Sequence, residues 1–264
     1  MIYDCTMFYN EFDMLRLRLH ELYDVVDGFV VSECNRTMNN EAKPFYLTDN
    51  LKDFDEFKNK LVVLVNTLNE NEDPWHKEFK LRNSAVQHIK FMAQPTDLVL
   101  VSNMDEIISA DAVKTLKDND DVTYTKFEQK LCYYWLNCVA AIPWHGPSAV
   151  SFKYINDYFK FMYIKRDAPF QLVPNGGFHF SYLGGPEAIF DKMKTFAHCN
   201  EDFVKQFVNL DWIKKCIVEP RDLFNRPEIK LSFVNVDSSY PKYIRDNIEY
   251  FKKYIYQPEK YLKI

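Results

Sequence analysis

Apolar runs alternate with helically spaced apolar residues along the N-terminal part of the chain. The runs that predict strands are residues 1–8, 28–33, 61–65 and the run that begins at Leu98. Apolar residues recur at helical spacing from Phe12 to Leu22, and a second helix is predicted from about His76 to Met92. Strands that alternate with helices predict a mainly parallel sheet with right-handed crossovers.

The pattern is less regular in the C-terminal part of the chain. A longer, partly antiparallel strand is predicted over Val122–Trp135 and another near Gly177–Tyr182. Helices are predicted from Pro186 to about Val218 and over Pro241–Ile255. No repeat, low-complexity tract or linker interrupts the chain. The sequence therefore predicts one α/β domain over residues 1–264, with a mainly parallel sheet flanked by helices and a partly antiparallel, helical C-terminal part.

The strand that begins at Leu98 ends on a cluster of oxygen-bearing side chains. Leu98–Val101 is a continuous apolar run, typical of a buried central strand, and Asp105 follows it closely. Ligands of open α/β sheets bind beyond the carboxyl ends of strands, where a carboxylate can hold a divalent ion against a diphosphate. The alternative is purely structural, because Ser109 or Asp111 can cap the next helix.

Composition excludes several classes of protein. The chain has 264 residues, of which 47% are hydrophobic, and a formal net charge of −5, so a full core is expected and nucleic-acid binding through a basic surface is not. No apolar stretch is long enough to span a bilayer, and the first residues lack a secretory signal, so a cytoplasmic or otherwise soluble protein is expected. The scattered cysteines predict reduced, mostly buried thiols.

Ordered motifs along the chain resemble those of a known family. The motifs are Tyr3-Asp4-Cys5, the run from Phe8 to Asp27, Glu33 with Asn35-Arg36-Thr37, Asp73-Pro74-Trp75, Arg82-Asn83, Asp105-Glu106-Ile107, Gly176-Gly177-Phe178-His179-Phe180-Ser181, Pro186-Glu187 and Lys192. In this order, over residues 2 to about 224, the sequence is similar to glycosyltransferase family 17, the bisecting β-1,4-N-acetylglucosaminyltransferases of N-glycans.

The resemblance implies a GT-A type, Rossmann-like fold and an inverting transfer of a sugar from UDP to a glycan. N-acetylglucosamine is the sugar that the animal members imply. Residues 1 to about 118 would form the nucleotide-binding half of a single GT-A-like domain, and residues from about 119 to 264 the acceptor-binding half. The chain departs from the family in having Asn103-Met104-Asp105 where an Asp-x-Asp motif is usual, and it lacks the membrane anchor and stem of the animal enzymes.

A divalent metal, Mn²⁺ or alternatively Mg²⁺, is expected to hold the donor diphosphate. Asp105 is the predicted ligand, because a divalent ion stabilises a departing diphosphate as a Lewis acid. Asn103 is a neutral second ligand or a partner of the ribose. His179, in a glycine-rich strand, could complete the metal site or bind a phosphate, and His198 is a weaker candidate of the same kind. The structural alternative is a satisfied core histidine.

Several further residues are predicted to contact the donor. They are Asn10, Glu11, Glu33, Arg36, Arg82 and Asn83, together with Asn103 and His179. The guanidinium groups suit phosphate oxygens, and the residues that follow the first strand suit the base or the ribose. The alternatives are an exposed surface arginine for Arg36 and a helix start for Glu11.

An inverting transfer also needs a base for the acceptor hydroxyl. Glu187 follows Gly184-Gly185-Pro186, and this segment can present a carboxylate to the acceptor, although an acid in a first helical turn is also ordinary helix design. Asp211 and Glu128 are the further candidates. Trp144 lies in a loop-like segment and is expected to face the acceptor.

Two other classes of function remain open from the sequence. One is a nucleotide-sugar-binding or glycan-binding protein that has lost catalysis. This class stays open because the chain has Asn103 where the family usually has an aspartate. The other is a metal-dependent phosphohydrolase or phosphotransferase that uses Asp105. A hydrolase with an aspartate nucleophile would want a second acid two positions further on, where this chain has Ile107.

Overall fold

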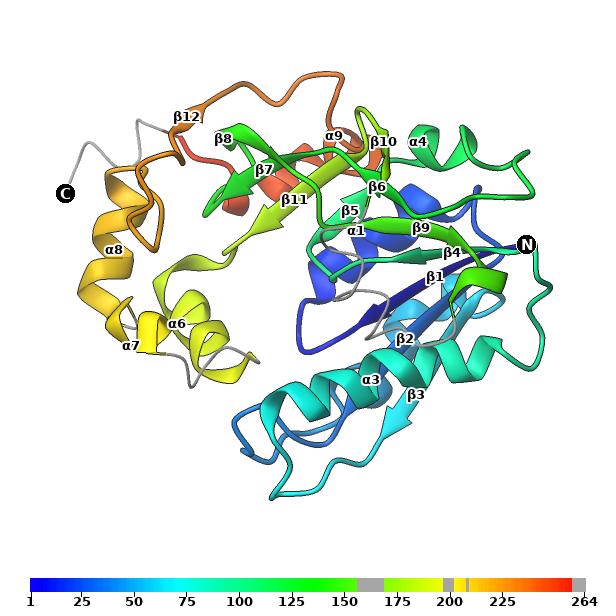
Figure 1. The fold of residues 1–264 in the computed structure, drawn as a ribbon. Coiled ribbons are helices and arrows are strands. Elements are labelled where there is room, and N and C mark those ends of the chain that lie inside the picture. The colour runs from blue at the N-terminus through cyan, green and yellow to red at the C-terminus, as the bar shows by residue number, and fades with distance from the viewer. Residues whose placement is uncertain (156–168, 197–201, 208, 258–264) are drawn as a thin grey trace.

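The computed structural model describes residues 1–155, 169–196, 202–207 and 209–257 (Figure 1). The strands are β1 (Ile2–Met7), β2 (Gly28–Cys34), β3 (Leu61–Asn66), β4 (Leu98–Val101), β5 (Glu106–Ile108), β6 (Thr125–Phe127), β7 (Gln129–Tyr133), β8 (Cys138–Trp144), β9 (Ser148–Ser151), β10 (Gln171–Val173), β11 (Gly177–Ser181) and β12 (Leu231–Phe233). The α-helices are α1 (Phe12–Leu22), α2 (Tyr46–Asp49), α3 (Pro74–Ile89), α4 (Ala110–Lys114), α6 (Gly185–Thr195), α7 (Asp202–Phe207), α8 (Leu210–Val218), α9 (Lys242–Asp246) and α10 (Ile248–Phe251). Short 3₁₀ helices are η1 (Leu51–Phe57), η2 (Phe152–Tyr154) and η4 (Lys252–Tyr254).

The larger sheet has seven strands in the order β10-β6-β9-β4-β1-β2-β3. Its β3-β2-β1-β4 portion is parallel throughout, which confirms the predicted α/β class with parallel strands. β9 pairs antiparallel with β4 and with β6. The chain runs outward from β1 in both directions, to β2 and to β4, so a crevice is expected beyond the carboxyl ends of these strands.

A second sheet, which the sequence did not predict, has five strands in the order β12-β8-β7-β11-β5. Its pairs are antiparallel except for β7 with β11. The structure therefore has two mixed sheets where the pattern predicted one mainly parallel sheet. β5 begins directly after Asp105, so the loop from Ser102 to Asp105 joins the larger sheet to the smaller one.

The strand predicted over Val122–Trp135 is wrong as a single element. It divides at Glu128 into β6, which belongs to the larger sheet, and β7, which belongs to the smaller. Both parts are rich in residues that favour strands, so local propensity cannot show that the chain changes sheets between them.

The helix predicted over Pro241–Ile255 is also broken. Asn247, with φ −118° and ψ 35°, lies outside the helical region and separates α9 from α10. Conversely, the helix predicted from His76 begins at Pro74 and ends at Ile89. Asp73 caps α3 by accepting hydrogen bonds from the backbone N–H groups of Trp75 and His76.

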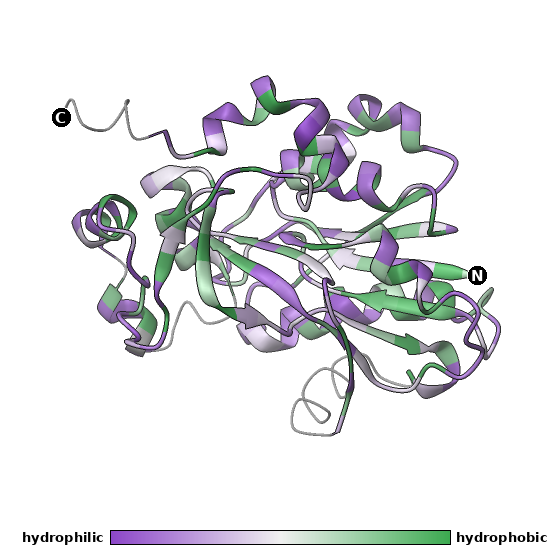
Figure 2. Ribbon diagram, turned by 90° about the horizontal axis from the view of Figure 1, so that it is seen from above, coloured by the Kyte–Doolittle hydropathy of each residue, from purple (hydrophilic) through white to green (hydrophobic). Residues whose placement is uncertain are grey.

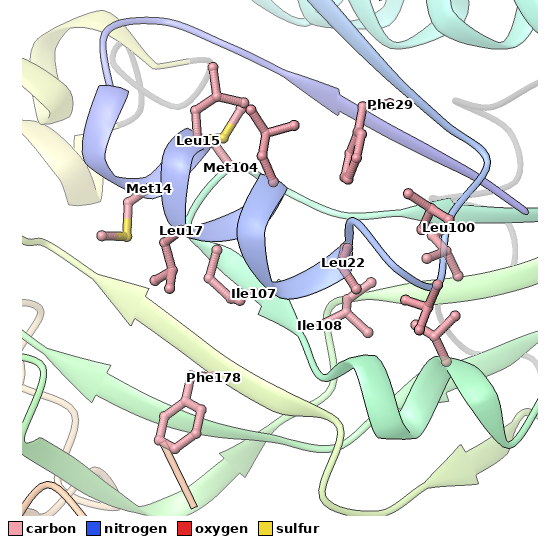
Figure 3. Close-up of a cluster of buried hydrophobic side chains, with 14 of the residues drawn as sticks. Met14, Leu15, Leu17, Leu22, Phe29, Leu100, Met104, Ile107, Ile108 and Phe178 are labelled. Atoms are coloured by element: carbon pink, nitrogen blue, oxygen red, sulfur yellow. The ribbon is translucent and has the colours of Figure 1, made fainter. Parts of the chain in front are cut away.

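Helix α1 fills the space between the two sheets. Figure 3 shows Leu17 close to Ile107 of β5, while Leu22 lies on the side of the helix nearer to Leu100 of β4. Hydrophobic residues are concentrated in the strands, and the outer helices carry mixed faces (Figure 2). Because α1 is buried from more than one side, it is a rigid support for the loop that joins β4 to β5.

Composition led to two expectations, one about the state of the cysteines and one about membrane-spanning segments. The cysteines of the described residues are all free and buried, as predicted, and they are Cys5, Cys34, Cys132, Cys138 and Cys216. Among the helices that the structure describes, none combines the length and apolar character that a membrane crossing requires.

Candidate functional site

A buried arginine fixes the loop between β4 and β5. Arg18 of α1 donates from Nε and Nη2 to the carboxylate of Asp4 in β1, at 2.6 and 2.5 Å. Its Nη1 donates to the carbonyls of Asn103 and Glu106, each at 3.0 Å, and its Nη2 also reaches the hydroxyl of Ser102 at 2.5 Å. The side chains of Arg18 and Asp4 are 0% and 1% exposed. One guanidinium thus ties β1, α1 and both ends of the loop together.

Sequence reasoning missed the role of this arginine. Arg18 is flanked by Leu17 and Leu19, both fully buried, so a charge inside an apolar helical segment was the available signal. A buried charge is retained only when it is paired and hydrogen-bonded. Asp4, in the middle of the first strand, was the matching signal on the other side.

Asp105 lies at the end of this loop, in contact with two residues from the C-terminal part of the chain. Its Oδ2 accepts a hydrogen bond from Lys192 Nζ of α6 at 2.6 Å, and its Oδ1 is 3.6 Å from His179 Nε2 of β11. The pairing of β11 with β5 sets His179 opposite Glu106, the neighbour of Asp105. Figure 1 shows α6 beyond the end of β1, on the same side as the loop. His198 lies outside the described residues.

Asp105 and Lys192 form a stable ion pair. Burial acts to raise the pKa of Asp105, but Lys192 and His179 together hold that pKa far below its ordinary value. Burial also acts to lower the pKa of Lys192, whereas the carboxylates of Asp105 and Glu11 raise it above its usual value. Both residues are therefore charged at neutral pH. The Asp105 side chain is only 11% exposed, whereas that of Lys192 is 38% exposed.

Glu106 has a structural role, because both of its carboxylate oxygens hold neighbouring groups. Its Oε2 accepts from the backbone N–H of Asn103 at 2.6 Å and its Oε1 from Trp144 Nε1 at 2.5 Å. The Trp144 ring in turn lies 4.9 Å from the ring of His179, centroid to centroid. A side chain at Gly146 would collide with both Trp144 and Glu106, which explains the glycine. Trp144 ends β8 instead of lying in a loop, and it is 37% exposed.

Asn103 and Arg82 contact each other next to Asp105. The Asn103 Oδ1 accepts a hydrogen bond from Arg82 Nη2 at 2.7 Å, and Arg82 also pairs with Glu78 on the same helix at 2.7 Å. Asn83, the next residue of α3, is half-buried. The structure thus brings together three of the predicted site residues, Arg82, Asn103 and Asp105, at the carboxyl end of β4.

The predicted residues after β1 approach the same place. Asn10 is exposed and Glu11 half-buried, and the Glu11 Oε2 accepts from the backbone N–H groups of Tyr9 and Asn10 at 3.0 and 3.1 Å. Glu11 is one of the carboxylates that raise the pKa of Lys192. Arg36 after β2 donates to the Asn40 carbonyl and pairs with Glu70, so its guanidinium holds a surface turn.

Glu33 occupies a fully buried position at the end of β2. Its Oε1 accepts from the backbone N–H of Leu47 at 2.7 Å, and its Oε2 accepts from the N–H and hydroxyl of Thr48 at 3.0 and 2.9 Å. Lys43 Nζ is 3.9 Å away. These contacts hold the start of α2 against β2, so a donor contact by Glu33 stays a prediction.

Substitution of Glu33 separates a structural role from donor binding. We expect Glu33→Gln to lower the free energy of unfolding by about 1–3 kcal/mol, because an amide cannot accept all of these hydrogen bonds. UDP affinity should stay within about 2-fold of the unaltered protein, since Glu33 is turned towards α2. Urea denaturation and calorimetry with UDP measure the two quantities. A large loss of UDP affinity with unchanged stability would instead indicate that Glu33 contacts the donor.

The three candidate bases lie on different elements. Glu187 is exposed in the first turn of α6, and Asp211 is exposed in the first turn of α8 after the Asn209 cap. Glu128 lies between β6 and β7, with its Oε2 3.4 Å from His145 Nε2. Lys192 lies five positions after Glu187 in α6. At about 100° per residue, the two side chains are about 140° apart around the helix axis. The Glu187 side chain is therefore turned away from that of Lys192 on α6.

A cavity of about 830 Å³ lies on the other face of the smaller sheet. Ile107 and Phe178 line it, whereas their strand neighbours Glu106 and His179 point to the opposite face. Glu128 also lines this cavity, and the Asp105–Lys192 pair does not. The cavity is therefore separate from the charged cluster, and the Lys242–Asp246 ion pair among its described lining residues is exposed.

The oxygen and nitrogen atoms around Asp105 do not fit the metal site that the sequence predicted. Lys192 occupies the position at Asp105 Oδ2 where a cation would bind, and the Asn103 amide oxygen already accepts from Arg82. His179 contributes a nitrogen near Asp105, and its Nδ1 is buried without a hydrogen-bond partner. Within the described ranges no group of three or more His, Cys, Asp or Glu side chains is placed to hold an ion. Of the carboxylates nearby, Asp105 is paired with Lys192, both oxygens of Glu106 accept hydrogen bonds, and one oxygen of Glu11 accepts two, which is a poor set for Mn²⁺ or Mg²⁺.

Comparison with known proteins identifies the family. A sequence model described as "Glycosyltransferase family 17" matches residues 1–249. The chain belongs to glycosyltransferase family 17. This match covers β1 through α9, including Asp105, His179 and Lys192, and confirms the resemblance carried by the ordered motifs.

Two curated family 17 relatives align with part of the chain. The human and rat proteins named beta-1,4-mannosyl-glycoprotein 4-beta-N-acetylglucosaminyltransferase are each 33% identical over 123 residues, which is 43% of this chain. The aligned part is 23% of each relative's length. Among solved structures, the inositol-1-phosphate CTP transferase from T. maritima is 8% identical with a TM-score of 0.37, covering 65% of this chain and 84% of that one. A likeness this low supports no conclusion about the fold.

Proposed function

We propose that this chain transfers a sugar from a UDP-sugar to a hydroxyl group of a glycan, with inversion at the anomeric carbon. N-acetylglucosamine is the proposed sugar, because the names of the human and rat relatives include it. The observation that carries the proposal is the position of the Asp105–Lys192 pair and His179 at the carboxyl end of β4, next to β1, where open α/β sheets bind nucleotides.

The strand order β3-β2-β1-β4 supports a GT-A type, nucleotide-binding fold for the N-terminal half of the chain. In this reading the ribose and base lie over the loop after β1, which Glu11 orders through the N–H groups of Tyr9 and Asn10. The diphosphate lies towards α6. The acceptor approaches from the C-terminal half, where Trp144 and His179 lie side by side.

The reaction is a single displacement. The acceptor oxygen attacks the anomeric carbon, the bond from that carbon to the diphosphate oxygen breaks, and the electron pair leaves with UDP. The acceptor proton passes to a carboxylate, for which we propose Glu187 because its first-turn position leaves it exposed to an approaching glycan. Asp105 orients Lys192 through the 2.6 Å hydrogen bond.

A donor screen tests the proposed function. Purified protein is incubated with each common UDP-sugar, both with Mn²⁺ and with EDTA, and free UDP and the melting temperature are measured. We expect UDP release from UDP-N-acetylglucosamine and a raised melting temperature, because a ligand that binds only the folded state stabilises it. Release of inorganic phosphate from phosphoesters, without sugar transfer, would instead indicate a hydrolase.

Loss of the Asp105 carboxylate should remove turnover and preserve the fold. We expect Asp105→Ala to lower UDP release by about 10²-fold, since misplacing a group that binds the reacting part of a substrate costs rate on that order. Lys192 is partly exposed and can be solvated once its partner is gone, so the melting temperature should change little. Asp111→Ala is the matched control, because this carboxylate is 89% exposed and pairs with Lys114 at the surface. Equal turnover in the two variants would contradict the site.

A further inference from the structure

The ammonium group of Lys192 lies where an Asp-x-Asp site would hold a cation. It donates to Asp105 Oδ2 at 2.6 Å from α6, a helix that begins far along the chain from β4. One side of the ammonium faces the carboxylate, which is 11% exposed, and the lysine side chain itself is 38% exposed. An ammonium group has three N–H donors. With one directed at Asp105, two remain for a ligand that reaches the ammonium.

The oxygens around this position are already in use. Both carboxylate oxygens of Glu106 accept hydrogen bonds, from Trp144 and from the backbone of Asn103. The amide oxygen of Asn103 accepts from Arg82. The neutral Asn103 also leaves the loop with one fewer negative charge than an Asp-x-Asp pair would give. A carboxylate that is already paired with a lysine attracts a divalent ion weakly, whereas the ammonium of a partly exposed lysine side chain attracts an anion.

We propose that Lys192 takes the place of the divalent cation in this chain, binding the diphosphate of the donor and neutralising UDP as it departs. Transfer then proceeds without a divalent metal. This inference rests on the proposed function and specifies how the same site holds its donor. Asp105 acts as the positioning residue, because it fixes the ammonium at the end of β4 through a contact that the β5–β11 pairing and α6 hold in place.

The displacement balances with Lys192 in this role. The bond between the anomeric carbon and the β-phosphate oxygen breaks, and its electron pair stays on that oxygen. The additional negative charge on UDP is stabilised by hydrogen bonds from the ammonium group, which remains protonated throughout. The acceptor oxygen forms the new bond to the anomeric carbon, and its proton passes to the base proposed above. No oxidant, reductant or second cofactor is required.

Binding of UDP in the presence of EDTA is the first test. Calorimetry should detect UDP binding to the unaltered protein without metal, at least 10-fold weaker binding to Lys192→Met, and binding to Lys192→Arg close to the unaltered level, because arginine retains the charge. Lys194→Met is the matched control, since Lys194 is exposed on the same helix and lies over the ring of Phe190. Melting temperatures confirm that each variant folds. UDP binding in EDTA that Lys192→Met leaves unchanged would overturn the inference.

Measurements of turnover with and without metal distinguish a failure of this inference from a failure of the proposed function on which it rests. We expect UDP release from UDP-N-acetylglucosamine to continue in EDTA and to fall at least 10²-fold in Lys192→Met. UDP release that disappears in EDTA and returns with Mn²⁺ would overturn the metal-free role of Lys192 while supporting a glycosyltransferase. An absence of UDP release from every UDP-sugar, with or without Mn²⁺, would overturn the proposed function itself.

Discussion

Arg18→Met should lower the free energy of unfolding by about 3–5 kcal/mol, because removing one partner of a buried pair leaves the other charge uncompensated. The partner is Asp4, which is only 1% exposed. Methionine keeps most of the side-chain volume, so the loss of stability comes from the missing charge and hydrogen bonds and not from a cavity. The variant also removes the guanidinium that donates to the carbonyls of Asn103 and Glu106, and Asn103 keeps the backbone N–H of Glu106 as a donor. Urea denaturation measures the change in stability.

Two further variants make this result specific. Arg16→Met, on the same helix, removes a surface pair with Glu56 in which the side chains are 28% and 50% exposed, and such a pair contributes about 0–1 kcal/mol. The double variant Asp4→Leu with Arg18→Met removes both buried charges and should recover part of the lost stability. A loss for Arg18→Met no larger than that for Arg16→Met would show that the buried pair does not hold the loop.

Replacement of Glu187 by glutamine should lower sugar transfer by about 10²–10⁴-fold, the usual contribution of a general base. Glutamine retains the shape and the hydrogen-bonding reach of the side chain but cannot accept the acceptor proton. UDP affinity should be unchanged, because Glu187 is turned away from Lys192 around the helix. The measurement is transfer of N-acetylglucosamine to an accepted glycan, alongside calorimetry with UDP.

The helix-terminal position of Glu187 provides the internal control. A first-turn carboxylate contributes only about 0.3–1 kcal/mol to stability, so the melting temperature of Glu187→Gln should stay near that of the unaltered protein. Glu128→Gln and Asp211→Asn are measured in the same assay. Transfer by Glu187→Gln within a few-fold of the unaltered protein would assign Glu187 to structure, and the variant that loses transfer would identify the base.

The sequence by itself determined the elements whose pattern is local. The continuous apolar run Leu98–Val101 predicted the buried strand β4, and helical spacing from Phe12 to Leu22 predicted α1, because burial of a strand or of one helix face needs no knowledge of the partner. Asp105 was predicted as a site residue from similarly local information, as a carboxylate that closely follows a buried strand. The family resemblance also came from ordered motifs in the sequence, and the family match over residues 1–249 confirms it.

Only the tertiary structure decided which side chains meet. Lys192 and Asp105 are 87 positions apart, and Arg18 reaches a carbonyl 88 positions away, so neither contact leaves a periodic signal in the sequence. Likewise, β6 and β7 are adjacent in the chain but belong to different sheets. The change from an expected metal site to a lysine–carboxylate pair depends on the register of β11 against β5 and on the position of α6. Such long-range contacts depend on how the whole chain packs around its core, and no short segment of the sequence specifies that packing.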